Sequence, residues 1–257
     1  MPLQIVTVPC LADNYAYLAH DVATGATAVI DVPEAAPVLN ALAARGWRAS
    51  HILITHHHGD HIEGVEALAA ATGARVIGAA ADAHRLPPLD EAVAPGDTVR
   101  IGMDAGTVID VPGHTIGHIA YHFPASRALF TGDSLMVMGC GRLFEGSPAQ
   151  MWDTLCRLSA LPDDTRVFSG HEYAATNARF ALSVEPDNPV LNARADEIAR
   201  TRGVGGFTVP ATLAEERASN PFLRAGDPAL KAALGMAGAD DIACFTELRA
   251  RRNVFTG

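Results

Sequence analysis

The sequence predicts an α/β fold in which two β-sheets carry helices on their outer faces, followed by a smaller helical domain. Over about the first 170 residues, short β-like runs are interspersed with helical segments, without the strict alternation of a single parallel sheet. After residue 173 nearly every segment has helical character, with Pro or Gly between the segments. We therefore expect a first domain over residues 1–172 and a helical domain over residues 173–257.

The expected strands are short runs rich in apolar and β-branched residues. They cover residues 3–8, 15–20, 27–32, 51–55, 75–78, 97–102, 106–111, 118–123, 127–132 and 166–170. Gly25 marks a turn between the second and third runs. The run at 51–55 is apolar without alternation, which is typical of a strand buried on both faces.

Helices are expected where Ala and Leu recur and where Gly or Pro ends the segment. They cover residues 37–44, 63–71 and 149–159 in the first domain, and 173–184, 189–202, 210–218, 228–234 and 240–252 in the second. In the second domain only residues 207–210, FTVP, have the character of a strand.

Composition argues against several classes of protein. The net charge of −10 repels a phosphate backbone and makes nucleic acid an unfavourable partner. No apolar run approaches the roughly 18–20 residues of a membrane span, and the N-terminus lacks the pattern of a secretory signal. The four cysteines are far apart and form no CxxC pair, which favours a reducing compartment. We therefore expect a cytoplasmic protein that binds neither nucleic acid nor membrane.

The segment THHHGDH, residues 55–61, contains an HxHxDH pattern of four candidate metal ligands, His56, His58, Asp60 and His61. In a loop, alternate residues can point to one place, and imidazole and carboxylate groups suit zinc, iron or manganese. Asp60 and His61 are adjacent, so they are not expected to point as the other two do. This indicates two metals. An accidental histidine tract would lie at a terminus, whereas this one follows an expected buried strand.

Three more candidate ligands, His114, Asp133 and His171, each follow an apolar strand that ends in Gly. Gly permits the sharp turn that lets a backbone approach a metal site closely. If these strands are neighbours, their ends meet on one rim of the sheets. A single histidine at a strand end is more often structural, but four occurrences of this pattern favour a metal site.

Together these positions offer five histidines and two aspartates. A tetrahedral metal needs at most four ligands, so seven donors fit two metals that share a bridge. Asp133 is the expected bridge, because a carboxylate has two oxygens. Two metals about 3.5–4 Å apart can share a hydroxide and supply a nucleophile at neutral pH. We expect two divalent metal ions per chain, zinc first, with iron or manganese as alternatives.

This pattern resembles the metallo-β-lactamase superfamily, which implies a four-layered αββα sandwich and, usually, hydrolysis. Further segments resemble more narrowly the glyoxalase II (hydroxyacylglutathione hydrolase) family, over nearly the whole chain and including its helical end. They are LADNYAYL (11–18), THHHGDHIEG (55–64), PGHTIGHIAY (112–121), FTGDSL (130–135), GCGRLFEG (139–146), SGHEY (169–173) and ERASNPFLR (216–224).

The resemblance implies a ligand set for each metal, namely His56, His58 and His114 for the first, Asp60, His61 and His171 for the second, and Asp133 as the bridge. It also implies the substrate S-D-lactoylglutathione, which a metal-held hydroxide would hydrolyse to D-lactate and glutathione, the second step of methylglyoxal detoxification. We expect a monomer acting on this small-molecule thioester.

The resemblance also implies a glutathione site, formed by Arg142, Phe144, Tyr173, Arg249 and Arg252. Arginine suits the carboxylates of the tripeptide, because its planar fork can bind them with two hydrogen bonds. Phe144 lacks the hydroxyl of the family's tyrosine, an expected loss of about 0.5–1.5 kcal/mol of binding. Arg249 and Arg252 also lie where the last helix ends, where cations complement the helix dipole, and Tyr173 could serve core packing.

Three alternatives stay open on the sequence alone. A glutathione persulfide dioxygenase on the same scaffold would use a single iron, held by two histidines and an aspartate. A nuclease of the superfamily would need a basic surface, which the acidic charge opposes. A non-catalytic metal-binding relative would keep the centre without turnover. The complete set of seven ligands favours the hydrolase.

Overall fold

The computed structural model describes all residues, 1–257. The chain divides into two compact units. The first unit comprises Met1–Val111 and Gly117–Gly132, and the second comprises Pro112–Ile116 and Asp133–Gly257. No helix is both long enough and apolar enough to cross a membrane.

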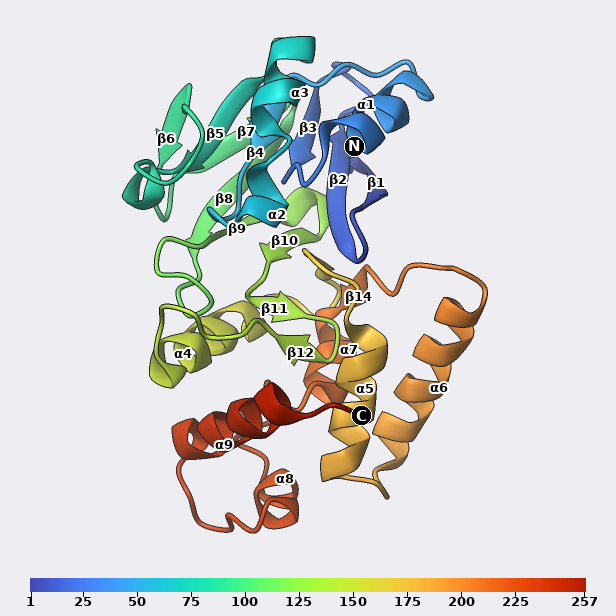
Figure 1. Cartoon of the computed structure of the whole chain (residues 1–257), viewed down its shortest axis with the longest axis vertical. Coiled ribbons are helices and arrows are strands. Elements are labelled where there is room, and N and C mark those ends of the chain that lie inside the picture. Colours follow the sequence, from blue (N-terminus) through green and yellow to red (C-terminus); the bar gives the residue numbers. More distant parts are fainter. The chain divides into compact units, whose positions relative to one another are not determined.

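The first sheet of the first unit has six strands in the order β1-β2-β3-β4-β5-β6 (Figure 1). They are β1 Gln4–Cys10, β2 Asn14–His20, β3 Thr27–Ile30, β4 His51–Leu53, β5 Arg75–Ala79 and β6 Glu91–Val93. The first three strands pair antiparallel, whereas β3 to β6 pair parallel. Because parallel neighbours end at the same edge, the segments that follow β3 and β4 lie side by side, and Asp31 N donates to Leu53 O at 3.0 Å.

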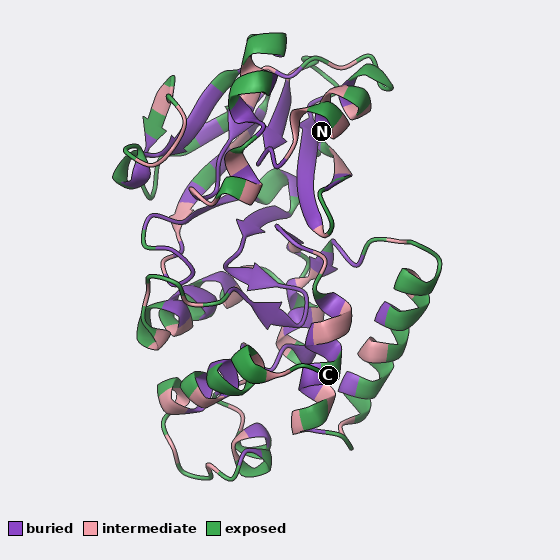
Figure 2. Cartoon of the chain, in the orientation of Figure 1, coloured by how far each residue is buried: buried purple, intermediate pink, exposed green.

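Helices α1 (Ala35–Ala43) and α3 (Val65–Thr72) pack against this sheet. Val38 of α1 and Leu68 of α3 belong to one buried cluster with residues of β1 to β5. Strand β2 is buried along its whole length, as its continuous purple in Figure 2 shows. A strand whose two faces are both covered loses the apolar–polar alternation of a surface strand.

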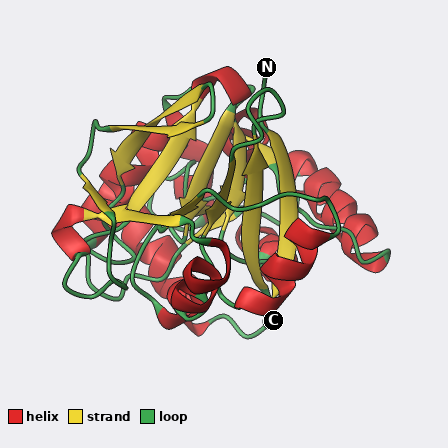
Figure 3. Ribbon diagram, turned by 90° about the horizontal axis from the view of Figure 1, so that it is seen from above, coloured by secondary structure: helices red, strands yellow, loops and turns green.

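The second sheet of this unit is an antiparallel meander of β7 Thr98–Ile101, β8 Asp104–Asp110, β9 Ile119–Phe123 and β10 Ala128–Gly132. Figure 3 shows the strands from above, in yellow. Tyr121 of β9 donates from its hydroxyl to Ile54 O, directly after β4, at 2.8 Å. This bond links the two sheets beside the HxHxDH segment. Two short 3-10 turns, η1 Ala80–Asp82 and η2 Pro124–Ser126, complete the unit with α2 Gly59–Ile62.

The second unit is mainly helical. Its helices are α4 Pro148–Ser159, α5 Ala174–Val184, α6 Pro189–Gly203, α7 Leu213–Ser219, α8 Pro228–Ala233 and α9 Asp241–Val254. Its strands are the hairpin of β11 Leu135–Met136 with β12 Gly139–Cys140, and the pair of β13 Arg166–Ser169 with β14 Ala211–Thr212. Five of the helices begin after a side chain that accepts a backbone N–H, as N-caps do. These caps are Ser147, Asn188, Thr212, Asp227 and Asp240.

The structure differs from the sequence-based expectations at several places. Residues 207–210 form no strand; the strand in this region is β14, Ala211–Thr212, which pairs with β13. Helix α7 begins at Leu213 and not at residue 210, because Thr212 caps it with Glu215 in a capping box. Asp60 and His61 lie on the short helix α2 and not in a loop. Strand β6 and the two strands of the β11–β12 hairpin are too short for a sequence pattern to predict them.

Candidate metal centre

The first half of the predicted ligand set lies in the first unit, after β4. His56 is buried, and its Nδ1 lies 3.1 Å from Thr55 Oγ1. Its Nε2 lies 3.1 Å from Nδ1 of His58. A tetrahedral zinc with bonds of about 2.0–2.1 Å separates two neighbouring nitrogen ligands by about 3.3 Å. The two rings therefore have the spacing of neighbouring ligands of one metal.

Asp60 and His61 lie on α2, which begins directly after His58. The ring of His61 is fully buried, and its Nδ1 donates to Asp31 Oδ2 at 2.9 Å. Because Nδ1 carries the donated proton, Nε2 is the nitrogen available to a metal. This Nε2 lies 4.0 Å from Asp60 Oδ2. Asn14 donates to the same carboxylate oxygen at 3.1 Å and to Asp60 O at 2.9 Å.

Asp31 is a functional residue that the sequence reasoning missed. It is buried directly after β3, with a left-handed φ of 53°. Its carboxylate accepts hydrogen bonds from Thr55 N and Thr55 Oγ1, both at 2.8 Å, besides the bond from His61. An aspartate directly after an apolar strand is the same signal that pointed to Asp133. Asp31 orients a predicted ligand and the start of the ligand segment.

The second half of the set lies in the second unit, where His114, Asp133 and His171 are all buried. Asp133 Oδ2 lies 3.4 Å from His114 Nε2 and 3.3 Å from His171 Nε2. Both distances match the spacing of about 3.3 Å expected between neighbouring ligands of one metal. A single carboxylate oxygen thus adjoins one histidine from each of the two ligand sets that the resemblance implies.

The backbone around these residues explains how they come so close. His114 Nδ1 donates to Arg142 O at 2.7 Å, which leaves its Nε2 directed to Asp133. A Cβ at Gly141 would collide with Asp133 O and lie 3.0 Å from His114 Nδ1. Gly132, directly before Asp133, has a positive φ of 47°. Both positions require glycine, one for close approach and one for the turn.

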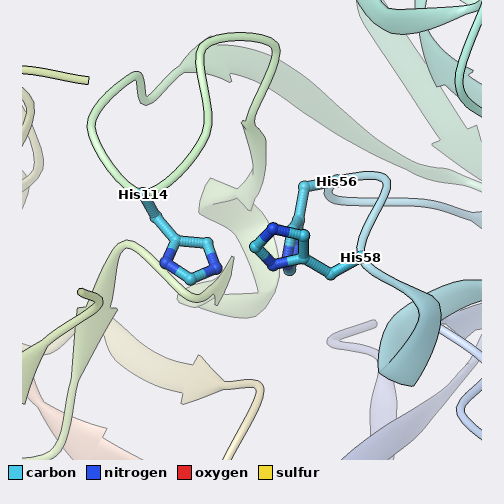
Figure 4. Close-up of side chains that lie close together, drawn as sticks. All are labelled: His56, His58 and His114. Atoms are coloured by element: carbon cyan, nitrogen blue, oxygen red, sulfur yellow. The ribbon is translucent and has the colours of Figure 1, made fainter. Parts of the chain in front are cut away.

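The candidate ligand atoms form three groups of three, and within each group all atoms lie within 4.8 Å of one another. The groups are His56, His58, His114; His56, His61, Asp133; and Asp60, His61, His171. Figure 4 shows the rings of the first group close together. Each of the seven predicted ligands belongs to a group. Imidazole nitrogens and carboxylate oxygens in such groups are a donor set that fits a divalent metal.

Two histidines near these ligands have supporting contacts. His57 Nδ1 lies 2.9 Å from Oδ2 of the buried Asp82, and its ring lies edge-on to that of His58, with centroids 4.9 Å apart. The His118 ring stacks on that of His56, with centroids 4.6 Å apart and an interplanar angle of 10°. Both contacts restrict the orientation of the HxHxDH segment.

Comparison with known proteins decides the family. The model of the metallo-β-lactamase superfamily matches residues 21–171, and that of the hydroxyacylglutathione hydrolase C-terminus matches residues 172–255. A hydroxyacylglutathione hydrolase of Cereibacter sphaeroides is 65% identical over 99% of this chain and 100% of its own length.

The chain belongs to the hydroxyacylglutathione hydrolase family.

Solved structures share the fold of this chain. ETHE1 from Myxococcus xanthus superposes with a TM-score of 0.65 and 27% identity, covering 99% of this chain and 91% of its own. TTHA1623 in a di-iron-bound form gives a TM-score of 0.57 and 28% identity, covering 65% and 91%. The prediction of a metallo-β-lactamase fold with a helical C-terminal region is confirmed. Family and donor groups together show that this hydroxyacylglutathione hydrolase family member uses divalent metal.

The two aromatic residues predicted to contact glutathione lie against predicted metal ligands. The Phe144 ring meets the His114 ring edge-on, with centroids 5.3 Å apart, and Phe144 is 61% exposed. The Tyr173 ring stacks on the His171 ring at 4.7 Å and is 37% exposed. Both therefore offer surface to a ligand next to histidines predicted to bind metal.

The predicted cations differ in their surroundings. Arg249 is only 7% exposed, donates from Nη1 to Cys140 O at 2.8 Å and lies over the ring of Phe222 at 5.1 Å. Its guanidinium is thus largely occupied by the protein itself. Arg252 is half-buried, and its Nε donates to Asn177 Oδ1 at 3.2 Å.

The charge around Arg252 is strongly positive. Burial lowers the pKa of its guanidinium, and the nearby charges of Arg249, Arg142 and Arg179 lower it further. Cations held near one another repel unless an anion lies among them. The local charge therefore favours a ligand that carries carboxylates, although the chain as a whole is acidic.

Proposed function

We propose that this chain hydrolyses S-D-lactoylglutathione and related S-2-hydroxyacylglutathiones to the 2-hydroxy acid and glutathione. The observation that carries the proposal is the position of Asp133 Oδ2, 3.3 and 3.4 Å from the Nε2 atoms of His171 and His114. This arrangement occurs in a chain that is 65% identical to a protein named hydroxyacylglutathione hydrolase. The name of that relative supplies the substrate class.

We further propose that the centre holds two divalent cations. His56, His58 and His114 would hold one, Asp60, His61 and His171 the other, and Asp133 both. Cations bound there would supply an activated water near neutral pH and a Lewis acid for charge that develops on the thioester oxygen. We place zinc first, with iron or manganese as alternatives, because these donors suit all three. The di-iron form of the neighbour TTHA1623 supports a two-metal site.

The chain's own residues orient this centre. Asp31 and the carbonyl of Arg142 accept the Nδ1 protons of His61 and His114, and so present each Nε2 inward. Asn14 donates a hydrogen bond to the carboxylate of Asp60 and so restricts its orientation. Thiolate is a good leaving group, so no side chain is required to protonate it.

We propose that the carboxylates of glutathione bind the arginines, with Arg142 and Arg252 in direct contact and Arg249 holding the Cys140 carbonyl between them. Phe144 and Tyr173 would line the path to the centre, and Phe144 offers an apolar edge where the family has a hydroxyl. We propose residues 1–172 as the catalytic domain and 173–257 as the glutathione-binding domain. The two family models, which meet at residues 171 and 172, support that boundary.

We also propose that the chain works as a monomer in the cytoplasm. All four cysteines are free in the structure, as expected for a reducing compartment.

One set of assays on protein of known metal content tests the proposed function against its rivals. We expect hydrolysis of S-D-lactoylglutathione, two metals per chain, and no oxygen uptake with glutathione persulfide. A single iron with oxygen uptake would identify a dioxygenase instead. Absence of turnover with both metals loaded would identify a non-catalytic relative, and cleavage of RNA a nuclease.

Replacing Arg252 tests the carboxylate contact. We expect Arg252→Ala to raise KM about tenfold with kcat within about twofold, because a tail bound equally in ground and transition states affects binding alone. Steady-state kinetics with S-D-lactoylglutathione measure both constants. Arg251→Ala is the matched control, since Arg251 is an exposed neighbour on the same helix that pairs with Glu247. A fall in kcat at unchanged KM in the Arg252 variant would contradict the proposed contact.

A further inference from the structure

The β11–β12 hairpin connects the two parts of the proposed reaction. It begins soon after Asp133, the proposed bridging ligand, and ends shortly before Arg142, a proposed glutathione contact. Met138, in its turn, has a left-handed φ of 53°. This conformation is unfavourable for a residue other than glycine. Such a turn persists only where the surroundings hold it in place.

Side chains from three helical segments hold the backbone of this hairpin. They come from α5, from α7 with the residue that follows it, and from α9. The bonds to the hairpin carbonyls are Asn177 Nδ2 to Val137 O (3.0 Å), Asn220 Nδ2 to Met136 O (3.2 Å) and Gly139 O (2.9 Å), and Arg249 Nη1 to Cys140 O (2.8 Å). Only one side chain in this set accepts a hydrogen bond from the hairpin: Glu216 of α7 takes the N–H of Met138 at 2.8 Å.

Glu216 is fully buried, and its carboxyl group is only partly satisfied. Its Oε2 accepts the bonds from Met138 N and from Asn220 Nδ2 at 2.9 Å, whereas its buried Oε1 has no hydrogen-bond partner. A buried charged oxygen without a partner is costly. Burial of this carboxyl group, with one oxygen unsatisfied, therefore costs free energy that other contacts of the fold offset.

The protonation of Glu216 follows from its surroundings. Burial raises its pKa from the ordinary 4.5 to about 7, although the bonds from Asn220 and Met138 act to lower it. The charged groups that face it are Arg194 of α6, which lowers the pKa, and Glu215 of its own helix, which raises it. The charge of Glu216 therefore changes near neutral pH.

We propose that Glu216 is a positioning residue for the thioester hydrolysis. Through Met138 N–H it fixes the left-handed turn of the hairpin, and with it the placement of Asp133 and Arg142 on either side. Glu216 contacts neither substrate nor metal ligand. The activity readout of this inference rests on the proposed function.

Two substitutions at the same position separate positioning from folding. Glu216→Leu keeps the volume but removes the acceptor, and we expect kcat at least about tenfold lower, KM raised and metal content reduced in folded protein. Glu216→Gln keeps an oxygen that can accept the Met138 bond, and we expect it to restore kcat to within about twofold. Glu197→Leu on α6, an acid whose side chain is 52% exposed, is the control for the substitution itself.

The thermal stability of Glu216→Gln gives a second readout. An acid whose pKa is raised on folding destabilises the fold as it ionises, so wild-type stability should fall as pH rises from about 4.5 to about 7. Glu216→Gln lacks this ionisation. We expect it to melt at a higher temperature than the wild type at pH 8, but not at pH 5.

The outcomes distinguish this inference from the proposed function. Wild-type protein without turnover would overturn the function itself. Active wild type together with a folded, fully metal-loaded Glu216→Leu of normal kcat and KM would overturn the positioning role alone. If Glu216→Leu does not fold, Asn220→Ala removes the neighbouring support of the same hairpin; normal kinetics in that folded variant would equally overturn the role.

Discussion

Asp133→Ala is expected to leave the purified chain with less than one metal ion per molecule and no measurable hydrolysis of S-D-lactoylglutathione. One oxygen of Asp133 adjoins the Nε2 atoms of both His114 and His171. Removing it takes a ligand from both proposed metals at once, and leaves two cations to repel each other without the shared carboxylate. Elemental analysis and the spectrophotometric thioester assay measure the two effects on the same sample.

Asp153→Ala is the matched control, because the side chain of Asp153 on α4 is 70% exposed and pairs only with Arg157. It should retain metal and activity. An Asp133→Ala protein that keeps two metals and near-normal rates would remove the bridging assignment.

Asp31→Asn is expected to lower metal affinity or activity by about 10–100-fold, as is typical when a partner of a metal-binding histidine is lost. Asparagine has the same shape and tolerates the left-handed φ of 53° at this position. An amide nitrogen in place of Oδ2 cannot accept the bonds from His61 Nδ1 and Thr55 Oγ1. Competition with a chelator, followed by activity, measures the loss.

Asp90→Asn serves as the control for this second variant. Asp90 accepts the N–H of Val76 at 2.8 Å and belongs to no candidate ligand group. Equal metal retention in the Asp31 and Asp90 variants would show that Asp31 does not support the centre.

The candidate ligands could be predicted because their chemistry is visible in the local sequence. HxHxDH places four donors in one segment, and His114, Asp133 and His171 each follow a strand that ends in Gly. Asp31 also directly follows an apolar strand, but the sequence does not show which residues it contacts, because those contacts depend on β3 and β4 being parallel neighbours. Sheet pairing of this kind is a tertiary property that a single sequence does not display.

The helical end shows a similar limit. Its helices could be predicted from helix-forming residues with Gly or Pro between the segments, but the sequence does not reveal what their side chains contact. Arg249 was expected to contact glutathione or to complement the helix dipole, and nothing in the sequence indicated that it would be buried against Cys140 O and Phe222. Glu216, in a segment that marked the family, gains its importance only because Met138 lies beside it. For both residues the surroundings depend on contacts with residues far away in the sequence, which a single sequence does not display.

Titration of metal-depleted protein with zinc, followed by the rate of S-D-lactoylglutathione hydrolysis, tests the two-metal centre most directly. We expect uptake and activity to rise together and to level off at two equivalents per chain. Full activity at one equivalent, with no further uptake, would contradict a centre in which seven side chains hold two cations.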